Sequence, residues 1–469
     1  MPHRKESKET GLFRDILYSL KGSNQDYTEI PLRRAILLLS VPMVLEMLME
    51  SVFAIVDIFF VSKLGSEAVA TVGLTETVIT IIYAIGMGLA TATTSLVSRR
   101  IGEKDPLKAS RTTFQAILAG IVVSTFIAIP GALYSRKILS MMGASHYIVN
   151  ELSGYTTVAL GSNAVIMLLF IINSVFRSSG DAATAMKVLW FANIINIILD
   201  PCLIFGLGPF PEMGVMGAAV ATATGRGMAV VWQFIILFRG HRRIKLRLAH
   251  FIPDPGIILK LIRLSLGGIA QNLIATTSWI FMIRILAKFG STVIAGYTIA
   301  IRIVIFALLP SSGISNASST LVGQNLGAGK PERAERAALK IGWINSILMG
   351  IIGLILVLRP ETFISFFIKD ADVIATGCVA LQIISLGFVS YALGMVMIGG
   401  INGAGDTFTP TKIFFLAFWM VEMPLAWFLS GPAGFDQYGV YYAIIFSETL
   451  LTVISWIVFR RGKWKLRRV

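Results

Sequence analysis

Three carboxylates interrupt the first long apolar run of the chain, residues 35–62, at Glu46, Glu50 and Asp57. Each residue of an α-helix turns by about 100°, so Glu50 lies about 40° and Asp57 about 20° from Glu46 around the helix axis. A charge near the centre of a bilayer costs roughly 2.5–3.5 kcal/mol on insertion scales. The pattern therefore indicates a spanning helix whose single acidic stripe faces a protein interior that handles protons or other cations.

A second polar group follows the same helical spacing in a later apolar run. Asn193, Asn196 and Asp200 share one helix face, and Pro201 leaves the Ile197 carbonyl without its helical hydrogen-bond partner. Hard oxygen ligands of this kind suit Na⁺, and the same groups could form a hydrogen-bond cage around a protonated aspartate. A structural polar contact between helices remains the alternative for each of these residues.

Together these patterns predict a cation or proton site shared by two helices of the first half of the chain. The predicted site residues are Asp57, Asn193, Asn196, Asp200 and Thr222. If the ion is Na⁺, its ligands would come from Asp57, Asn196 and Asp200. We expect additional protonation or substrate sites at Glu46 and Glu50, where a structural ion pair is the alternative.

The composition indicates a membrane protein that must hold these residues within helices. Of 469 residues, 55% are hydrophobic and 14% are charged, whereas soluble proteins average about 25% charged residues. The net charge of +15 comes largely from basic residues in short loops between apolar runs, which sets membrane orientation and does not indicate nucleic-acid binding. Cys202 and Cys378 lie in apolar runs, so they predict neither a disulfide framework nor a zinc site.

Twelve apolar runs predict an all-α integral membrane protein with twelve transmembrane helices. The runs are 35–62, 68–98, 112–134, 147–176, 186–207, 215–238, 259–287, 292–323, 338–358, 373–401, 411–430 and 438–459. Lysine and arginine are concentrated in every second connection and in both tails, which predicts a multi-pass protein of the plasma (inner) membrane with both termini cytoplasmic. Residues 1–34 lack a signal-peptide pattern, so we expect the first spanning helix to act as the insertion signal.

The chain also repeats itself after a shift of 225 residues. Gly88 aligns with Gly313, and Arg111 aligns with Arg336. Six helices repeated in parallel orientation predict two lobes related by an axis along the membrane normal, which is a common transporter plan with the substrate path at the lobe interface. The predicted boundaries are a cytoplasmic tail at 1–34, an N-lobe at 35–238, a linker at 239–258, a C-lobe at 259–459 and a second tail at 460–469.

Enzyme chemistry finds no support in the sequence. The four histidines lie in tails or loops, and no nucleophile–base pair or metal-ligand cluster is present. The glycine-rich stretches 177–181 and 402–406 follow membrane helices and are read as tight turns with an aspartate at a helix start. Without a Walker A sequence, ATP is not the fuel, and we expect no cofactor beyond a coupling ion.

Six segments give the chain a family resemblance. They are VDIFFVSKLG (56–65), LVSRRIGEKD (96–105), VFRSSGDAAT (175–184), NIILDPCLIFGLG (196–208), LVGQNLGAGKPERA (321–334) and INGAGDTFTPTK (401–412). With them the chain resembles the multidrug and toxic compound extrusion (MATE) transporters over essentially its whole membrane portion. The resemblance implies a V-shaped, twelve-helix exporter of cationic amphipathic compounds in exchange for Na⁺ or H⁺.

The resemblance also assigns particular residues. Asp57 matches the family's helix 1 aspartate, Asn196 and Asp200 match an ion-site pair in helix 5, and Thr222 matches a helix 6 threonine. The norfloxacin-exporter branch has acids in helices 7 and 10, whereas this chain has Gln271 and no acid in helix 7, and none in helix 10. The pattern is therefore similar to the DNA-damage-inducible and archaeal branch, and it favours a first-lobe site.

Two other functions are considered, and each would require residues that an exporter of cations does not need. A lipid or lipid-linked precursor flippase of the same superfamily would need a large basic cavity, for which Arg226, Arg284 and Arg302 are candidates. A membrane-embedded enzyme would need a convergent nucleophile or metal set. The expected partners are small cationic organic compounds and the lipid bilayer, with no nucleic acid, and the protein is expected to be a monomer.

Overall fold

The computed structural model describes residues 12–22, 25–240, 244–247 and 252–467. The predicted basic tail before residue 12, parts of the predicted linker and the last two residues therefore lie outside the described residues. The first half comprises α1 (Leu12–Lys21), α2 (Leu32–Ser62), α3 (Ser66–Gly102), α4 (Pro106–Leu133), α5 (Ser135–Met141), η1 (Ile148–Leu152), α6 (Ser153–Gly161), α7 (Asn163–Ser178), α8 (Ala182–Phe205) and α9 (Val215–Arg239).

The second half begins after the linker and is also helical. It comprises α10 (Pro255–Leu286), η3 (Ala287–Phe289), α11 (Ser291–Gly327), α12 (Pro331–Leu358), α13 (Pro360–Ile364), α14 (Ala371–Leu386), α15 (Phe388–Gly403), α16 (Phe408–Phe414), η4 (Phe415–Glu422), α17 (Met423–Ser430), α18 (Asp436–Arg460) and η5 (Lys463–Leu466). The all-α fold class is thus confirmed. Each predicted apolar run coincides with one helix or with a helix broken into consecutive pieces.

Length and composition identify ten of the described helices as membrane spans, or up to eleven when the bent pair α14–α15 is included as one span. The two helices of this pair meet at an angle of 51°. The count leaves out α2, the helix with the acidic stripe. With 31 residues, α2 is about 46 Å long at a rise of 1.5 Å per residue, which also suffices to cross a bilayer.

Local sequence explains where several helices begin. Asp105 precedes Pro106, and its side chain accepts a hydrogen bond from the Lys108 backbone N–H at the start of α4. This hydrogen bond lowers the pKa of Asp105. Asp181 and Asp406 likewise accept hydrogen bonds from the residues three positions later, as predicted for aspartates at helix starts.

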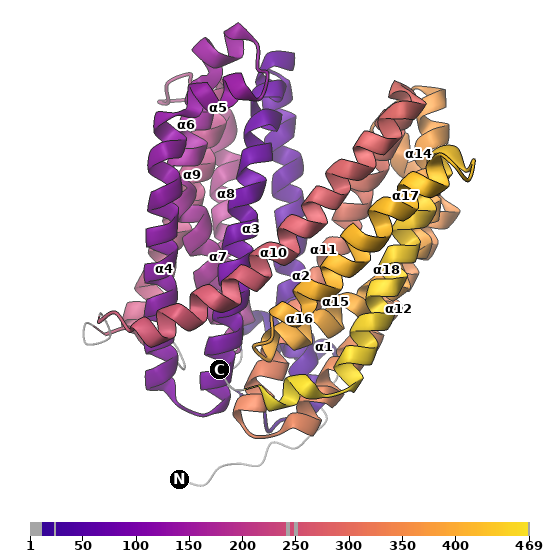
Figure 1. The fold of residues 1–469 in the computed structure, drawn as a ribbon. Coiled ribbons are helices and arrows are strands. Elements are labelled where there is room, and N and C mark those ends of the chain that lie inside the picture. The colour runs from indigo at the N-terminus through magenta and orange to yellow at the C-terminus, as the bar shows by residue number, and fades with distance from the viewer. Residues whose placement is uncertain (1–11, 23–24, 241–243, 248–251, 468–469) are drawn as a thin grey trace.

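The helices form two bundles that diverge away from the end of the molecule at which α1 and the last turns of α18 lie (Figure 1). One bundle, the N-lobe, contains α3–α9, and the other, the C-lobe, contains α11–α18. The first helix of each half contacts both lobes, because α2 packs against α8 and α11, and α10 packs against α3 and α16. One face of α2 therefore packs against α8 of the N-lobe, and another face packs against α11 of the C-lobe.

The structure preserves the 225-residue repeat in detail. The bounds of α3, α4 and α7 recur after this shift in α11, α12 and α15. Equivalent contacts recur as well: a Cβ added to Gly88 would lie 2.8 Å from the Ser265 carbonyl oxygen, and one added to Gly313 would lie 2.7 Å from the Met43 carbonyl oxygen. Small residues thus allow the close crossings of α3 with α10 and of α11 with α2.

Candidate functional site

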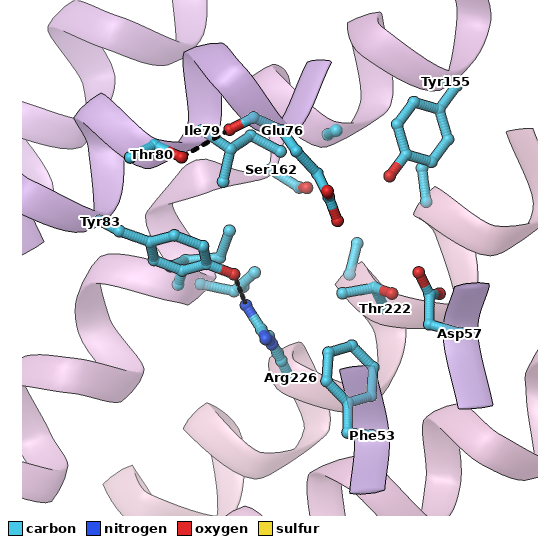
Figure 2. A pocket seen from close by; sticks show the side chains of 15 residues that line it. Phe53, Asp57, Glu76, Ile79, Thr80, Tyr83, Tyr155, Ser162, Thr222 and Arg226 are labelled. Atoms are coloured by element: carbon cyan, nitrogen blue, oxygen red, sulfur yellow. Dashed lines mark hydrogen bonds between the residues drawn. The ribbon is translucent and has the colours of Figure 1, made fainter. Parts of the chain in front are cut away.

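A cavity of about 280 Å³ lies within the N-lobe. It is bounded by Phe53 and Asp57 of α2, by Glu76, Ile79, Thr80 and Tyr83 of α3, by Tyr155 and Ala159 of α6, by Ser162, by Val165 and Ile166 of α7, and by Ala219, Thr222, Ala223 and Arg226 of α9. Figure 2 shows polar ends from α2, α3, α6 and α9 pointing into the same space. The cavity therefore combines apolar residues with convergent polar groups, which together can hold a small molecule.

The charge of Arg226, the arginine that lines the cavity, is balanced by an ion pair with Glu50. Arg226 is 4% exposed, and its guanidinium donates to the Glu50 carboxylate at 3.1 Å and to the Tyr83 hydroxyl at 3.1 Å. The ring of Phe53 lies 5.2 Å from the guanidinium carbon, a cation–π distance. Because Glu50 balances Arg226, this pair gives the cavity little net charge.

The two acids that line the cavity are not paired in this way. The carboxylates of Asp57 and Glu76 form no hydrogen bond or ion pair with any described residue, and both point into the cavity in Figure 2. Asp57 lies within range of the charges of Glu76 and Arg226, and Glu76 lies within range of Arg302 on α11. The cavity therefore presents acidic oxygen atoms to any ligand that enters it.

Behind the cavity wall, three predicted residues form a connected group. The Asn196 side-chain N–H₂ donates to Asp200 Oδ1 at 3.1 Å and to Thr222 Oγ1 at 3.0 Å. Asp200 is fully buried, and its Oδ2 has no hydrogen-bond partner among the described residues. Thr222 also lines the cavity, so it links the buried aspartate to the space that Asp57 faces.

The remaining predicted residues lie deeper in the lobe. Asn193 is buried, and its N–H₂ lies 3.4 Å from Glu50 Oε2. Glu46 is 1% exposed and accepts from Arg177 at 2.7 Å and from Asn173 at 3.2 Å. The structure thus brings Asp57, Asn196, Asp200 and Thr222 to the cavity and its wall. Glu46 and Glu50 instead have arginine partners.

The repeat shows what the Glu46–Arg177 pair replaces. The equivalent positions in the C-lobe are Gln271 and Asn402, whose side-chain amides exchange hydrogen bonds at 3.3 and 3.0 Å. Gln271 also donates to the Thr407 carbonyl at 3.0 Å. The same contact between two helices is therefore ionic in one lobe and neutral in the other.

Several residues of the site were missed in the sequence. Arg177 belongs to the stretch 177–181, for which the sequence predicts a tight turn, although a single basic residue at the end of the apolar run 147–176 also indicates a partner for an acid. Tyr83, Tyr155 and Phe53 carry no pattern that separates them from ordinary aromatic residues of a spanning helix. Among the described residues no three His, Cys, Asp or Glu side chains gather as a metal site, so an ion here would depend on amide and hydroxyl oxygens as well.

Comparisons with known proteins agree with this architecture. The MatE family model matches residues 42–202 and 269–428. The "Probable multidrug resistance protein NorM" of Thermotoga maritima is 27% identical over 459 residues, covering 96% of this chain and 97% of that protein. The "FAD transporter" of Shewanella oneidensis is 28% identical over 309 residues, covering 66% of this chain and 68% of that protein.

A solved structure shares the fold. It is described as the "Outward-facing conformation of a multidrug resistance MATE family transporter of the MOP superfamily" and has a TM-score of 0.86 at 24% identity. The match covers 97% of this chain and 98% of that one. At this level of identity the likeness shows the two-lobe fold and carries no assignment of individual residues.

Proposed function

The chain belongs to the MatE family, and we propose that it is a secondary active multidrug efflux transporter that exchanges cationic amphipathic compounds for H⁺ or Na⁺ by alternating access. The observation that carries the proposal is the pair of carboxylates, Asp57 and Glu76, facing a cavity with apolar and polar walls whose arginine is balanced by Glu50. Apolar walls suit the body of an amphipathic compound, and unpaired carboxylates suit its positive charge.

The same groups provide a route for exchange. Asp57 faces the cavity, and Thr222 connects the cavity to the buried Asn196–Asp200 pair. A coupling ion bound at Asp57 and Asp200 would neutralise the charge that attracts the compound, so ion and compound would compete for one acidic region. A ligand shifts a two-state equilibrium only through different affinities for the two states, and this competition supplies such a difference.

The rival proposal of an anionic substrate, such as a lipid-linked precursor, rests on basic residues near the substrate path. Arg226 is occupied by Glu50 and Tyr83. Arg284 is exposed on α10, and Arg302, exposed on α11, lies within electrostatic range of Glu76. One relative is named an "FAD transporter", so we keep an anionic substrate as a second candidate. A flippase would show no ethidium efflux, and its anionic substrate would require the charged Arg226 to be released from Glu50.

Efflux of ethidium from cells that express the protein tests the proposal. We expect Asp57→Asn and Asp200→Asn to reduce the efflux rate by about tenfold or more, equivalent to about 1.4 kcal/mol. Glu361→Gln is the control, since Glu361 is an exposed acid of α13 outside the cavity. Efflux that is unchanged in both aspartate variants at equal protein levels would refute the site, and no efflux by the wild type would refute the function.

The coupling ion is tested with purified protein in proteoliposomes. Transport driven by a Na⁺ gradient alone is compared with transport driven by a pH gradient alone. We propose that one of these gradients supports accumulation and that Asp200→Asn abolishes it. Equal transport with neither gradient present would instead indicate a facilitator that is not coupled to an ion.

A further inference from the structure

A second cavity, of about 20 Å³, lies inside the C-lobe between α11, α14, α15 and α18. Seven of its nine lining residues stand 225 positions after a residue that lines the N-lobe cavity. The pairs include Ile79 with Val304, Ser162 with Gly387, and Ala223 with Glu448. The small cavity is therefore the repeat counterpart of the candidate site, with an acid at a different position. Its volume suffices for about one water molecule or ion.

Glu448 lines this cavity, and a second acid, Glu422, lies within electrostatic range of it. Glu422, at the end of the π-helical segment η4, is 2% exposed and accepts a hydrogen bond from the Ser278 hydroxyl at 3.1 Å. Ser447, next to Glu448, is the second hydroxyl neighbour of Glu422. Ser447 is also the repeat counterpart of Thr222, which joins the Asn196–Asp200 pair to the N-lobe cavity. In both lobes, the hydroxyl residue at this repeat position, Thr222 or Ser447, therefore lies close to buried acidic side chains.

Two stacked, buried tyrosines, one of them within electrostatic range of both acids, have hydroxyls without partners among the described residues. Tyr297 and Tyr441 are each 1% exposed, and their rings stack with centroids 6.1 Å apart. Neither hydroxyl has a hydrogen-bond partner among the described residues. Tyr297 lies within the electrostatic range of both Glu422 and Glu448. A buried hydroxyl without a partner costs about 1–3 kcal/mol, so these groups point to a ligand that completes the cluster.

No described basic residue balances the two acids. Arg284 on α10, Arg302 on α11 and Lys412 on α16 are exposed, and neither Glu422 nor Glu448 forms an ion pair with any described residue. The titratable groups that face the acids are instead tyrosines, namely Tyr297 and Tyr391. Two ionised carboxylates in a membrane interior without a cation are strongly unfavourable, so a bound cation must supply the missing charge.

We propose that Glu422 and Glu448, together with Ser278 and Tyr297, form a second cation site in the C-lobe that holds a proton or Na⁺. The sequence placed a cation site in the first lobe because helices 7 and 10 lack acids. In the structure, η4 and α18 instead place Glu422 and Glu448 within electrostatic range of each other. This extends the proposed exchange function, but the binding site itself can be tested in protein that transports nothing.

A second cation would change what drives the exchange. Exchange of one H⁺ or Na⁺ for one monovalent cationic compound moves no net charge, so the membrane potential does not contribute to its driving force. Two cations for one compound move one net charge, so 100 mV would add about a fiftyfold gradient. The C-lobe site thus predicts voltage-dependent transport that Glu448→Gln makes voltage-independent.

The direct test is infrared spectroscopy of the purified protein in lipid nanodiscs, following the carbonyl absorption of protonated carboxylic acids in Na⁺-free buffer at neutral pH. Glutamine has nearly the shape of a protonated glutamate, so Glu422→Gln and Glu448→Gln should fold, which size-exclusion chromatography checks. If the site holds a proton, at least one variant loses part of the wild-type absorption. Glu361→Gln, which removes an exposed acid, should leave it unchanged.

Adding Na⁺, with K⁺ as the ionic-strength control, distinguishes the two cations. A loss of carbonyl absorption that requires Na⁺ and is absent in Glu448→Gln identifies a Na⁺ site, and absorption indifferent to Na⁺ identifies a proton site. The proposal is overturned if both folded variants match the wild type in every buffer. Because this readout involves no transport, its failure is distinct from a failure of efflux by Asp57→Asn.

Discussion

Glu46 and Arg177 place opposite charges in the core of the N-lobe, with Oε1 and Nη1 2.7 Å apart. Removing one partner of a buried ion pair leaves the other uncompensated, which typically costs 3–5 kcal/mol. We therefore expect Glu46→Gln to lower the free energy of unfolding by about 3–5 kcal/mol, seen as a lower melting temperature of the purified protein.

The C-lobe provides the compensating variant. Glu46→Gln combined with Arg177→Asn copies the neutral pair that Gln271 and Asn402 form at the equivalent place. The double variant should recover most of the melting temperature, because it leaves no buried charge unpaired. A double variant that is as unstable as the sum of its single changes would show that the ion pair has a role that neutral amides cannot replace.

At the same scale, the sequence predicted some residues of the site and missed others for a physical reason. Helical spacing placed Asn196 and Asp200 on one face, and the structure shows them hydrogen-bonded. Spacing within one helix cannot show which residue of another helix arrives opposite, so Arg177 and Tyr83 were not connected to Glu46 and Arg226. Such partners depend on how separate helices pack.

At the scale of elements, the apolar runs predicted the helices but not where they break. The helix between residues 148 and 178 is interrupted at Ser162, and its counterpart is interrupted at Gly387. These positions are 225 residues apart and both line cavities. Because the apolar pattern continues through each break, composition contains no signal for it. The repeat could have marked the two positions as equivalent but not as broken.

The ends of α3 and α11 approach so closely that two equivalent glycines are required. A Cβ added to Gly102 would lie 2.0 Å from the Gln324 carbonyl oxygen, and one added to Gly327 would lie 2.1 Å from the Arg99 carbonyl oxygen. The clashing atoms belong to the backbone and cannot move aside as a flexible side chain can. An alanine at either position would therefore push the two helices apart. We expect Gly102→Ala to destabilise this contact by about 1–3 kcal/mol, as for other overpacked sites.

Gly73 supplies the control within the same helix. A Cβ at Gly73 would meet no atom within 4 Å, so Gly73→Ala should be neutral or stabilising by up to about 1 kcal/mol. Melting temperatures of the two purified variants make the comparison. Equal melting temperatures would mean that the lobes are not held this closely at their joined ends.

At the scale of the whole molecule, residues 26–30 form a strap that touches both lobes near the termini. On the N-lobe side, the Tyr27 hydroxyl donates to the Gly180 carbonyl at 2.9 Å, and Lys104 pairs with Asp26 and Glu29 at 3.4 and 2.7 Å. These acids raise the pKa of Lys104, so on the alkaline side the pairs persist until the pH passes that raised pKa.

On the C-lobe side, the strap is held through its backbone. Lys330 donates to the Thr28 carbonyl at 3.0 Å, and Arg333 donates to the Tyr27 carbonyl at 3.1 Å and also to the Ile30 carbonyl. One short segment therefore connects the ends of the two lobes that lie together in Figure 1. The alternating access proposed above would require these ends to separate, and the strap would then have to release at least one lobe in the opposite state.

This requirement predicts a shift between the two states when the strap is weakened. Tyr27→Ala removes the hydrogen bond to Gly180 and the ring that packs against it. Spin labels at Arg111 and Arg336, exposed and equivalent positions of α4 and α12, would report the distance between the lobe ends by electron paramagnetic resonance. The wild type should favour a short distance, and Tyr27→Ala should add a longer one. Tyr134→Ala, which removes an exposed tyrosine elsewhere on the N-lobe, should leave the distribution unchanged. An unchanged distribution in Tyr27→Ala would show that the glycine contact of α3 and α11 keeps the ends together without the strap.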